Sequence, residues 1–332
     1  MQRVYPRVLV INGTPIGYPS NTGVTLQRLF DGWQSDRLLQ VCYFTGDSPS
    51  GIQFDMMRFP PQTAPVDWIM RKLLRSLPMN LPKTGVGGMN ANISEVSLKG
   101  KLHDFVRALL DNSPIRVSAD LLKQVDAFQP QVIYSNLGGL RILKTVLFFA
   151  QRYDIRIIGH FMDDWQSTIY TSSPFTSWAH RKVDQQIRRC LKRSVCSVGI
   201  SEYMAETYQT RYGVPFTWAS NPIDAPETLT LPPTGSKFVL TYSGGLHLNR
   251  WKSLEVVAEV LERLNQEGHQ TALAIYTGEN HRAEFQPKMK PLSVLEWRGQ
   301  VKPEEIPAVL SASHVVIHVE SFDPALVNYT RY

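Results

Sequence analysis

Two glycines and two cations lie between a predicted strand and a predicted helix in the segment 241–264. The glycines are Gly244 and Gly245, and the cations are Arg250 and Lys252. Glycine lets backbone N–H groups approach phosphate oxygens, while the cations and the positive end of the helix dipole neutralise charge. The segment is therefore suited to hold a phosphorylated ligand. The alternative is an ordinary strand-to-helix turn with surface cations, because a Gly-Gly pair alone is weak evidence.

A second polar loop follows the first predicted strand of the chain. It contains Gly13 and leads into Asn21, Thr22 and Gly23 at the start of a predicted helix. Backbone amides at a helix N-terminus again favour an anion. The alternative is a simple strand-to-helix turn in which Thr22 is the N-cap.

Acidic and imidazole side chains mark two further strand ends. His160, Asp163 and Asp164 follow one strand, and Glu320 closes another. The adjacent acids are suited to a catalytic base or acceptor clamp, to a metal pair, or to helix capping. A metal is the least supported of these, because no other cluster has the spacing of metal ligands. For Glu320 the alternative is a charged residue that merely ends a buried strand.

Strands alternate with helices along most of the chain, which is typical of parallel α/β folds. The first part predicts strands at 7–12, 39–44, 131–136, 156–161, 194–201 and 216–219, with helices at 23–33, 118–128, 140–153, 178–192 and 202–212. The last part predicts strands at 238–243, 271–277, 294–297 and 314–319, with helices at 253–266, 281–290 and 303–312. The stretch 49–114 has no regular pattern and stays unassigned.

A proline-rich break divides the chain into two predicted domains. Residues 221–236 contain four prolines and show neither the helical nor the strand periodicity, so they are predicted to be a linker. We therefore expect an N-terminal Rossmann-like domain at 1–220 and a C-terminal one at 237–332. The fold class is α/β, with two doubly wound sheets and a crevice between the carboxyl ends of their strands, where such sheets bind ligands.

The composition is that of an ordinary globular protein with an affinity for anions. The chain has 332 residues, 43% hydrophobic content and a formal net charge of +6. This charge favours nucleotide diphosphates, anionic lipid surfaces or nucleic acid as partners. Three cysteines without paired spacing predict free thiols. Neither a signal peptide nor an apolar stretch of about 20 residues is evident, so a cytoplasmic protein is expected.

The predicted helix at 178–192 is strongly basic on its outer faces. Val183, Ile187, Cys190 and Leu191 share one apolar face. Such a helix is usually a solvated surface. The alternative is contact with an anionic membrane surface that presents a lipid-linked acceptor. Nucleic acid is not expected, since no nucleic-acid-binding motif is present.

Four stretches of the chain resemble, in order, the motifs of family 4 glycosyltransferases with the GT-B fold. They are residues 8–30, 157–165, 199–224 and 238–323. The sequence Gly-Gly-Leu at 244–246 stands where the family has Gly-Arg-Leu, so the usual arginine is absent. Arg250 or Lys252 would stand for the lysine that the family carries some residues further on. Glu320 matches the first acid of the family's Glu-x7-Glu motif, but Asn328 occupies the position of the second.

The resemblance implies transfer of a sugar from a nucleotide-diphosphate donor to a saccharide or lipid-linked acceptor, with retention of configuration. The donor would bind the second domain, with Glu320 against its sugar, and the acceptor would bind the first. His160, Asp163 and Asp164 would lie near the transferred sugar. No cofactor or metal is expected, because cations and amides can stabilise the leaving diphosphate. By analogy, the pathway would be polysaccharide biosynthesis.

Family members continue beyond the point that corresponds to Tyr332, so the second domain is expected to be incomplete. Weak or absent transfer would follow. Two other functions therefore stay open. One is a catalytically defective remnant that binds donor or partner, and the other is a sugar-nucleotide epimerase of the same architecture. Peripheral contact with the inner face of the membrane is also left open.

Overall fold

The computed structural model forms two compact units, which hold the described residues up to 220 and from 237 onward. The structure describes residues 5–18, 20–42, 55–58, 105, 108–109, 111–170, 176–220, 237–247, 249–302 and 305–319. The predicted linker at 221–236, Glu320 and Asn328 lie outside these ranges.

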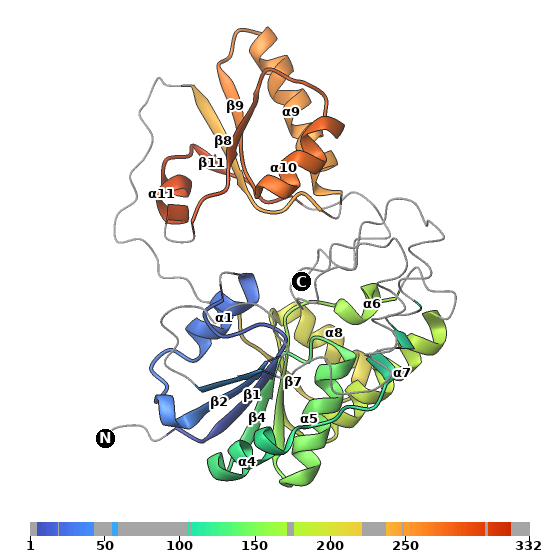
Figure 1. Ribbon diagram of the computed structural model, residues 1–332. Helices are drawn as coiled ribbons and strands as arrows, with labels where there is room; N and C mark the ends of the chain where they lie inside the picture. The colour runs from blue at the N-terminus through green and yellow to red at the C-terminus, as the bar shows by residue number, and fades with distance from the viewer. Residues whose placement is uncertain are drawn as a thin grey trace, which may run out of the picture. The chain divides into compact units, whose positions relative to one another are not determined.

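The first unit is built on a seven-stranded sheet in which every pairing is parallel. Its order is β3-β2-β1-β4-β5-β6-β7 (Figure 1). The strands are β1 (Val8–Asn12), β2 (Leu38–Cys42), β3 (Asp55–Arg58), β4 (Val132–Ser135), β5 (Arg156–Phe161), β6 (Ser194–Gly199) and β7 (Phe216–Trp218). Because the chain moves outward from β1 on one side and from β4 on the other, the order reverses between these two strands.

Helices cover both faces of this sheet. They are α1 (Asn21–Leu29), α4 (Ala119–Phe128), α5 (Leu140–Arg152), α6 (Trp165–Thr168), α7 (Thr176–Leu191) and α8 (Glu202–Tyr212). Val8 and Val10 of β1 pack in one cluster with Leu26 of α1, whereas Leu9 and Ile11 pack in the cluster that contains α4, α5, α7 and α8. Burial on both faces is what an all-parallel sheet requires.

The second unit repeats this plan on a smaller scale, with a parallel sheet in the order β10-β9-β8-β11. Its strands are β8 (Phe238–Ser243), β9 (Thr271–Tyr276), β10 (Leu295–Gly299) and β11 (Val315–Val316), and its helices are α9 (Arg250–Gln266), α10 (Glu279–Phe285) and α11 (Ile306–Ser311). The chain moves across the sheet in one direction from β8 through β9 to β10, and in the opposite direction from β10 to β11. Right-handed crossovers therefore place α11 on the other face from α9 and α10. The predicted fold class, doubly wound parallel α/β, is confirmed.

Local predictions hold well inside the elements and less well at their ends. Ser201 caps α8 by accepting a hydrogen bond from the Met204 amide, and Gly213 ends it at φ +68°, as predicted. The alternative in which Thr22 is an N-cap is wrong. Ser20 caps α1 by accepting from the Gly23 amide at 3.2 Å, so Thr22 lies inside the helix.

Two further boundaries differ from the prediction. Helix α9 begins at Arg250, three residues before the expected start, because Asn249 adopts a left-handed conformation at φ +59° and begins the helix there. Strand β3 lies in the stretch that the sequence left unassigned, and it pairs with β2 through backbone bonds.

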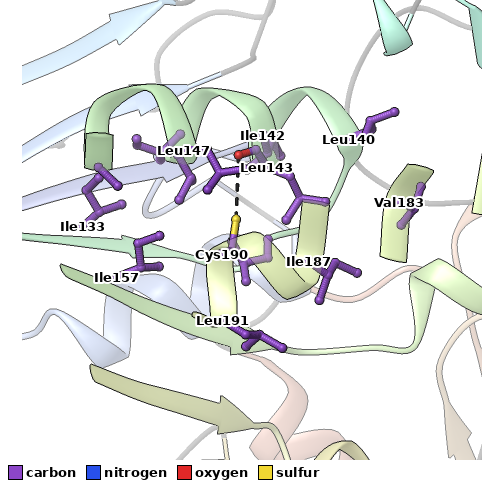
Figure 2. Close-up of a cluster of buried hydrophobic side chains, with 14 of the residues drawn as sticks. Ile133, Leu140, Ile142, Leu143, Leu147, Ile157, Val183, Ile187, Cys190 and Leu191 are labelled. Carbon is purple, nitrogen blue, oxygen red and sulfur yellow. Dashed lines mark hydrogen bonds between the residues drawn. The ribbon is translucent and has the colours of Figure 1, made fainter. Parts of the chain in front are cut away.

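The core of the first unit is centred on the contact between α5 and α7 (Figure 2). The predicted apolar face of α7 is buried, with Val183, Ile187, Cys190 and Leu191 less than 5% exposed. The Cys190 thiol donates to the Leu143 carbonyl oxygen at 3.8 Å. The cations of α7 thus lie on its remaining faces, opposite the core.

Replacing Ile187 by Ala is expected to lower the free energy of unfolding by about 2–5 kcal/mol, because it leaves a cavity in a fully packed contact. Chemical denaturation measures this loss. The matched control is Val195→Ala, a change at a strand residue that is 62% exposed. It should cost within about 0.5 kcal/mol, and an equal loss in both variants would contradict the packing described here.

Candidate functional site

The glycine loop of the second unit lies at the point where its strand order reverses. Strand β8 has β9 on one side and β11 on the other, and the chain leaves β8 directly into Gly244 and Gly245. In doubly wound sheets the loops at such a switch point diverge and leave a crevice outside the carboxyl ends of the strands. The loop is therefore at the position where such a sheet binds a ligand.

Side-chain hydrogen bonds fix this loop. The Tyr242 hydroxyl donates to the Gly245 carbonyl oxygen at 2.7 Å. The Leu246 amide donates to Nδ1 of His281, the third residue of α10, at 3.0 Å. The His247 ring lies edge-on to the His281 ring, with centroids 5.3 Å apart. Contacts from β8 and α10 therefore hold the loop in one conformation.

The predicted cations occupy the first turn of α9 rather than the loop before it. Arg250 is its first residue, and Lys252, with an exposed side chain, is its third. This turn contains no acidic residue, and Asn249 provides no side-chain cap. The Nε atom of Arg250 is buried without a hydrogen-bond partner among the described residues. The turn thus combines two positive charges with the positive end of a 17-residue helix.

Burial and nearby positive charge keep the imidazole of His247 neutral. Burial, the charge of Arg250 and the proximity of His281 lower the pKa of His247 to about 4. At neutral pH, Arg250 and Lys252 therefore supply the positive charge of this loop, and His247 supplies a neutral imidazole.

The first unit carries a polar edge at its own switch point, between β1 and β4. Asn12 ends β1 and is fully buried. Its Oδ1 accepts from the Asn136 amide, just after β4, at 2.8 Å, while its Nδ2 has no partner among the described residues. After Asn12 the chain runs through buried Gly13 toward Gly23, where a Cβ atom would lie 2.2 Å from the Tyr18 carbonyl oxygen. Only glycine permits this close turn.

His160 belongs to the same edge. It lies in β5, next to β4, and is 2% exposed. Its Nδ1 and the Tyr134 hydroxyl are hydrogen-bonded at 2.7 Å. Burial lowers the pKa of His160 to about 4, and the nearby backbone of Ala219 offsets this only in part. The imidazole is therefore neutral at physiological pH and is suited to hydrogen bonding rather than to carrying charge.

The adjacent acids Asp163 and Asp164 lie in different surroundings. Asp164 is buried and accepts hydrogen bonds from Arg211 at 2.7 and 3.3 Å, from Tyr208 at 2.7 Å and from Ser167 at 2.7 Å. Burial raises its pKa, but these bonds outweigh burial and hold the pKa below the ordinary value. Asp164 thus connects α6 to α8, which favours the structural role that the sequence left open.

Asp163 is exposed instead. Desolvation by neighbouring protein raises the pKa of Asp163, a hydrogen bond from the Trp165 backbone lowers it, and the charge of Asp164 raises it further. Of the two acids, Asp163 is therefore the one that a substrate can reach.

The structure thus groups the predicted residues within each unit. Gly13 belongs to the β1–α1 turn, Gly23 is the third residue of α1, and His160 lies near the end of β5, while Gly244, Gly245, Arg250 and Lys252 form one loop and helix start. Asn21 and Thr22 are in the first turn of α1. Within the described ranges, no three His, Cys, Asp or Glu side chains gather closely enough to hold a metal ion.

Sequence reasoning missed several residues of these sites. Tyr134, Asn136, His247 and His281 were not singled out, although Asn136 directly follows an apolar strand, as Asn12 ends one. A buried amide at the end of an apolar strand is a usable signal. No sequence pattern placed His281 beside Leu246, since 35 residues separate them.

No protein-family model and no curated protein matches the chain. Solved structures similar to it include the lipopolysaccharide outer core galactosyltransferase WaaB, with 11% identity over 93% of this chain and 72% of that one, at a TM-score of 0.49. UGT89C1 of Arabidopsis thaliana, solved with quercetin, has 14% sequence identity over 94% of this chain and 73% of that one, at a TM-score of 0.47. The spinosyn rhamnosyltransferase SpnG has 15% sequence identity over 94% of this chain and 74% of that one, at a TM-score of 0.44. Similarity at this level assigns a role to no residue.

Acid is expected to destabilise the first unit through His160. Its pKa is about 4 in the fold, and an unfolded histidine has a pKa of about 6.5, so the unfolded chain binds more protons between these values. Stability should therefore fall as pH decreases through this window, by up to ~1.4 kcal/mol per pH unit. Denaturation at a series of pH values measures the slope.

His160→Asn is the matched variant, because its amide can occupy the Nδ1 position without titrating. It should show a shallower slope between pH 6.5 and 4 than the unmodified chain. Asp164, with its lowered pKa, contributes below this window, since its stabilisation is lost only as pH falls below about 3.9. An identical slope in both proteins would contradict the buried, neutral state of His160.

Proposed function

We propose that the chain is a glycosyltransferase that takes its sugar from a nucleotide-diphosphate donor. The second unit would bind the donor diphosphate, and the polar edge of the first unit would bind a saccharide or lipid-linked acceptor. Glu320 would contact the donor sugar, as the resemblance implies, and the sugar would be transferred with retention of configuration.

The single observation that carries this proposal is the start of α9. A glycine loop at a sheet switch point leads into a helix whose first turn holds Arg250 and Lys252 and no acid. Backbone amides and the helix dipole act at this turn, and Arg250 and Lys252 add positive charge to it, which suits a group with two adjacent phosphates. The same charges stabilise the leaving diphosphate as the glycosidic bond to the nucleotide breaks.

The first unit supports the acceptor side. The Nδ2 of Asn12 is buried and lacks a hydrogen-bond partner among the described residues. A buried polar atom without a partner costs about 1–3 kcal/mol, and a sugar hydroxyl would supply the missing bond. Asp163, which follows β5, is exposed and would be the base or clamp for the acceptor hydroxyl.

We further propose that catalysis needs neither a metal nor another cofactor. The positive charge at the start of α9 would do the work that a divalent cation does elsewhere. The donor itself would be a substrate, not a cofactor.

A cytoplasmic location with peripheral membrane contact is proposed for the same enzyme. Arg181, Lys182 and Arg189 are exposed on α7, on the side opposite its apolar face. Such a surface would attract anionic lipids that carry an acceptor. No helix in the described part of the chain combines the length and apolar content needed to cross a bilayer.

Two other functions predict different products from the same donor site. A defective remnant would bind the nucleotide diphosphate without turnover. An epimerase would release a free epimer and transfer nothing to an acceptor. Chromatography of the products formed with a panel of nucleotide sugars separates the three, and polysaccharide biosynthesis follows only if a saccharide acceptor is extended.

Removing either cation should weaken the binding of nucleoside diphosphates. A charged hydrogen bond contributes about 1.5–3 kcal/mol, so at least one of Arg250→Ala and Lys252→Ala should lose about tenfold or more in affinity. Calorimetry with uridine and thymidine diphosphate measures the loss. Lys302→Ala, a change at an exposed cation elsewhere in the unit, is the control. Unchanged affinity in both loop variants would exclude this loop from the site.

Turnover should persist in excess chelator. The reason is that, in the proposed mechanism, the two cations at the start of α9 take the role of a metal ion. The assay compares product formation with and without chelator at one donor concentration. Complete loss of product that added magnesium or manganese restores would overturn the metal-independent mechanism.

A further inference from the structure

One peptide group of the glycine loop is hydrogen-bonded at both of its polar atoms by side chains. The carbonyl oxygen of Gly245 accepts from the Tyr242 hydroxyl at 2.7 Å, and the amide of Leu246 donates to Nδ1 of His281 at 3.0 Å. This oxygen and this N–H belong to the same planar unit. The two bonds therefore fix the orientation of the whole peptide plane, which we call the clamped peptide.

The imidazole rings also explain why position 245 is glycine. A Cβ atom there would lie 2.6 Å from Nδ1 and 2.7 Å from Cε1 of His247, and 3.2 Å from Cε1 of His281. Real Cβ contacts are not as short as the two distances to His247, so any other residue would displace that ring, whereas the distance to His281 would require only a small shift. The second glycine thus makes room for the His247 ring that packs against His281.

The hydrogen bond from the Leu246 amide determines which ring nitrogen of His281 carries a hydrogen. An imidazole nitrogen that accepts a hydrogen bond carries no proton, so His281 is neutral with its hydrogen on Nε2. The rings that pack against His281 are His247, at a centroid distance of 5.3 Å, and Phe285, at 5.9 Å.

We propose that Tyr242 and His281 are positioning residues, which clamp the 245–246 peptide and so hold the glycine loop in the conformation that receives a nucleotide diphosphate. The clamped amide points at His281, so it is not a donor to phosphate. Neighbouring amides and the start of α9 are left to bind the anion. This inference rests on the proposed function for its ligand, but the clamp itself is a property of the chain without ligand.

The test compares four variants without ligand and with uridine diphosphate. His281→Asn places an amide oxygen where Nδ1 was, and His281→Gln places it further out, near Nε2. His281→Ala removes the acceptor, and Tyr242→Phe removes the hydroxyl donor. Hydrogen exchange at the Leu246 amide reports the clamp, exchange within α9 and thermal unfolding report general folding, and calorimetry reports affinity.

In the chain without ligand, His281→Ala, His281→Gln and Tyr242→Phe should exchange the Leu246 amide about fivefold faster or more, the factor for one neutral hydrogen bond. His281→Asn should stay within about twofold of the unmodified chain. Affinity for uridine diphosphate should fall by similar factors in the same three variants. Exchange in α9 should not change.

Exchange in His281→Ala equal to that of the unmodified chain would overturn the clamp, as would His281→Asn exchanging as fast as His281→Ala. Faster exchange with unchanged affinity would overturn the positioning role. If the unmodified chain binds no nucleoside diphosphate, the proposed function fails on its own, and the exchange rates still decide whether the clamp exists.

Discussion

The arrangement of both units depends on one constraint, which is that an all-parallel sheet must bury both of its faces. Helices on both faces leave the carboxyl edge as the place where polar side chains, loop amides and helix N-termini gather. Asn12 and Asn136 are hydrogen-bonded there in the first unit, and His160 lies near the end of β5 at the same edge. Gly244, Gly245 and the start of α9 meet there in the second.

Burial at these edges sorts the ionisable groups into neutral and charged ones. His160 and His247 are neutral because desolvation lowers the pKa of each to about 4. Asp164 keeps its charge only because Arg211 and two hydroxyl groups bind it. The remaining positive charge of the second edge is concentrated on Arg250 and Lys252, so the field at the start of α9 favours an anionic ligand.

The fold could be predicted from the sequence because apolar runs such as 8–11 and 272–275 are buried strands whose residues alone indicate them. Local chemistry also predicted the caps at Ser201 and Gly213. Contacts between distant elements could not be predicted. His281 meets Leu246 through the packing of α10 beside β8, and Asp164 and Asp163 differ only through their surroundings. The early start of α9 depends on the left-handed Asn249, which no periodicity reveals.

The central claim is that the loop after β8 and the first turn of α9 bind a nucleotide diphosphate. Hydrogen exchange across the whole unmodified chain, with and without each of several nucleoside diphosphates, tests it most directly. The account predicts saturable protection in residues 243–253, with a smaller response in α10 through His281. Protection confined to other segments, or none with any nucleoside diphosphate, would contradict it.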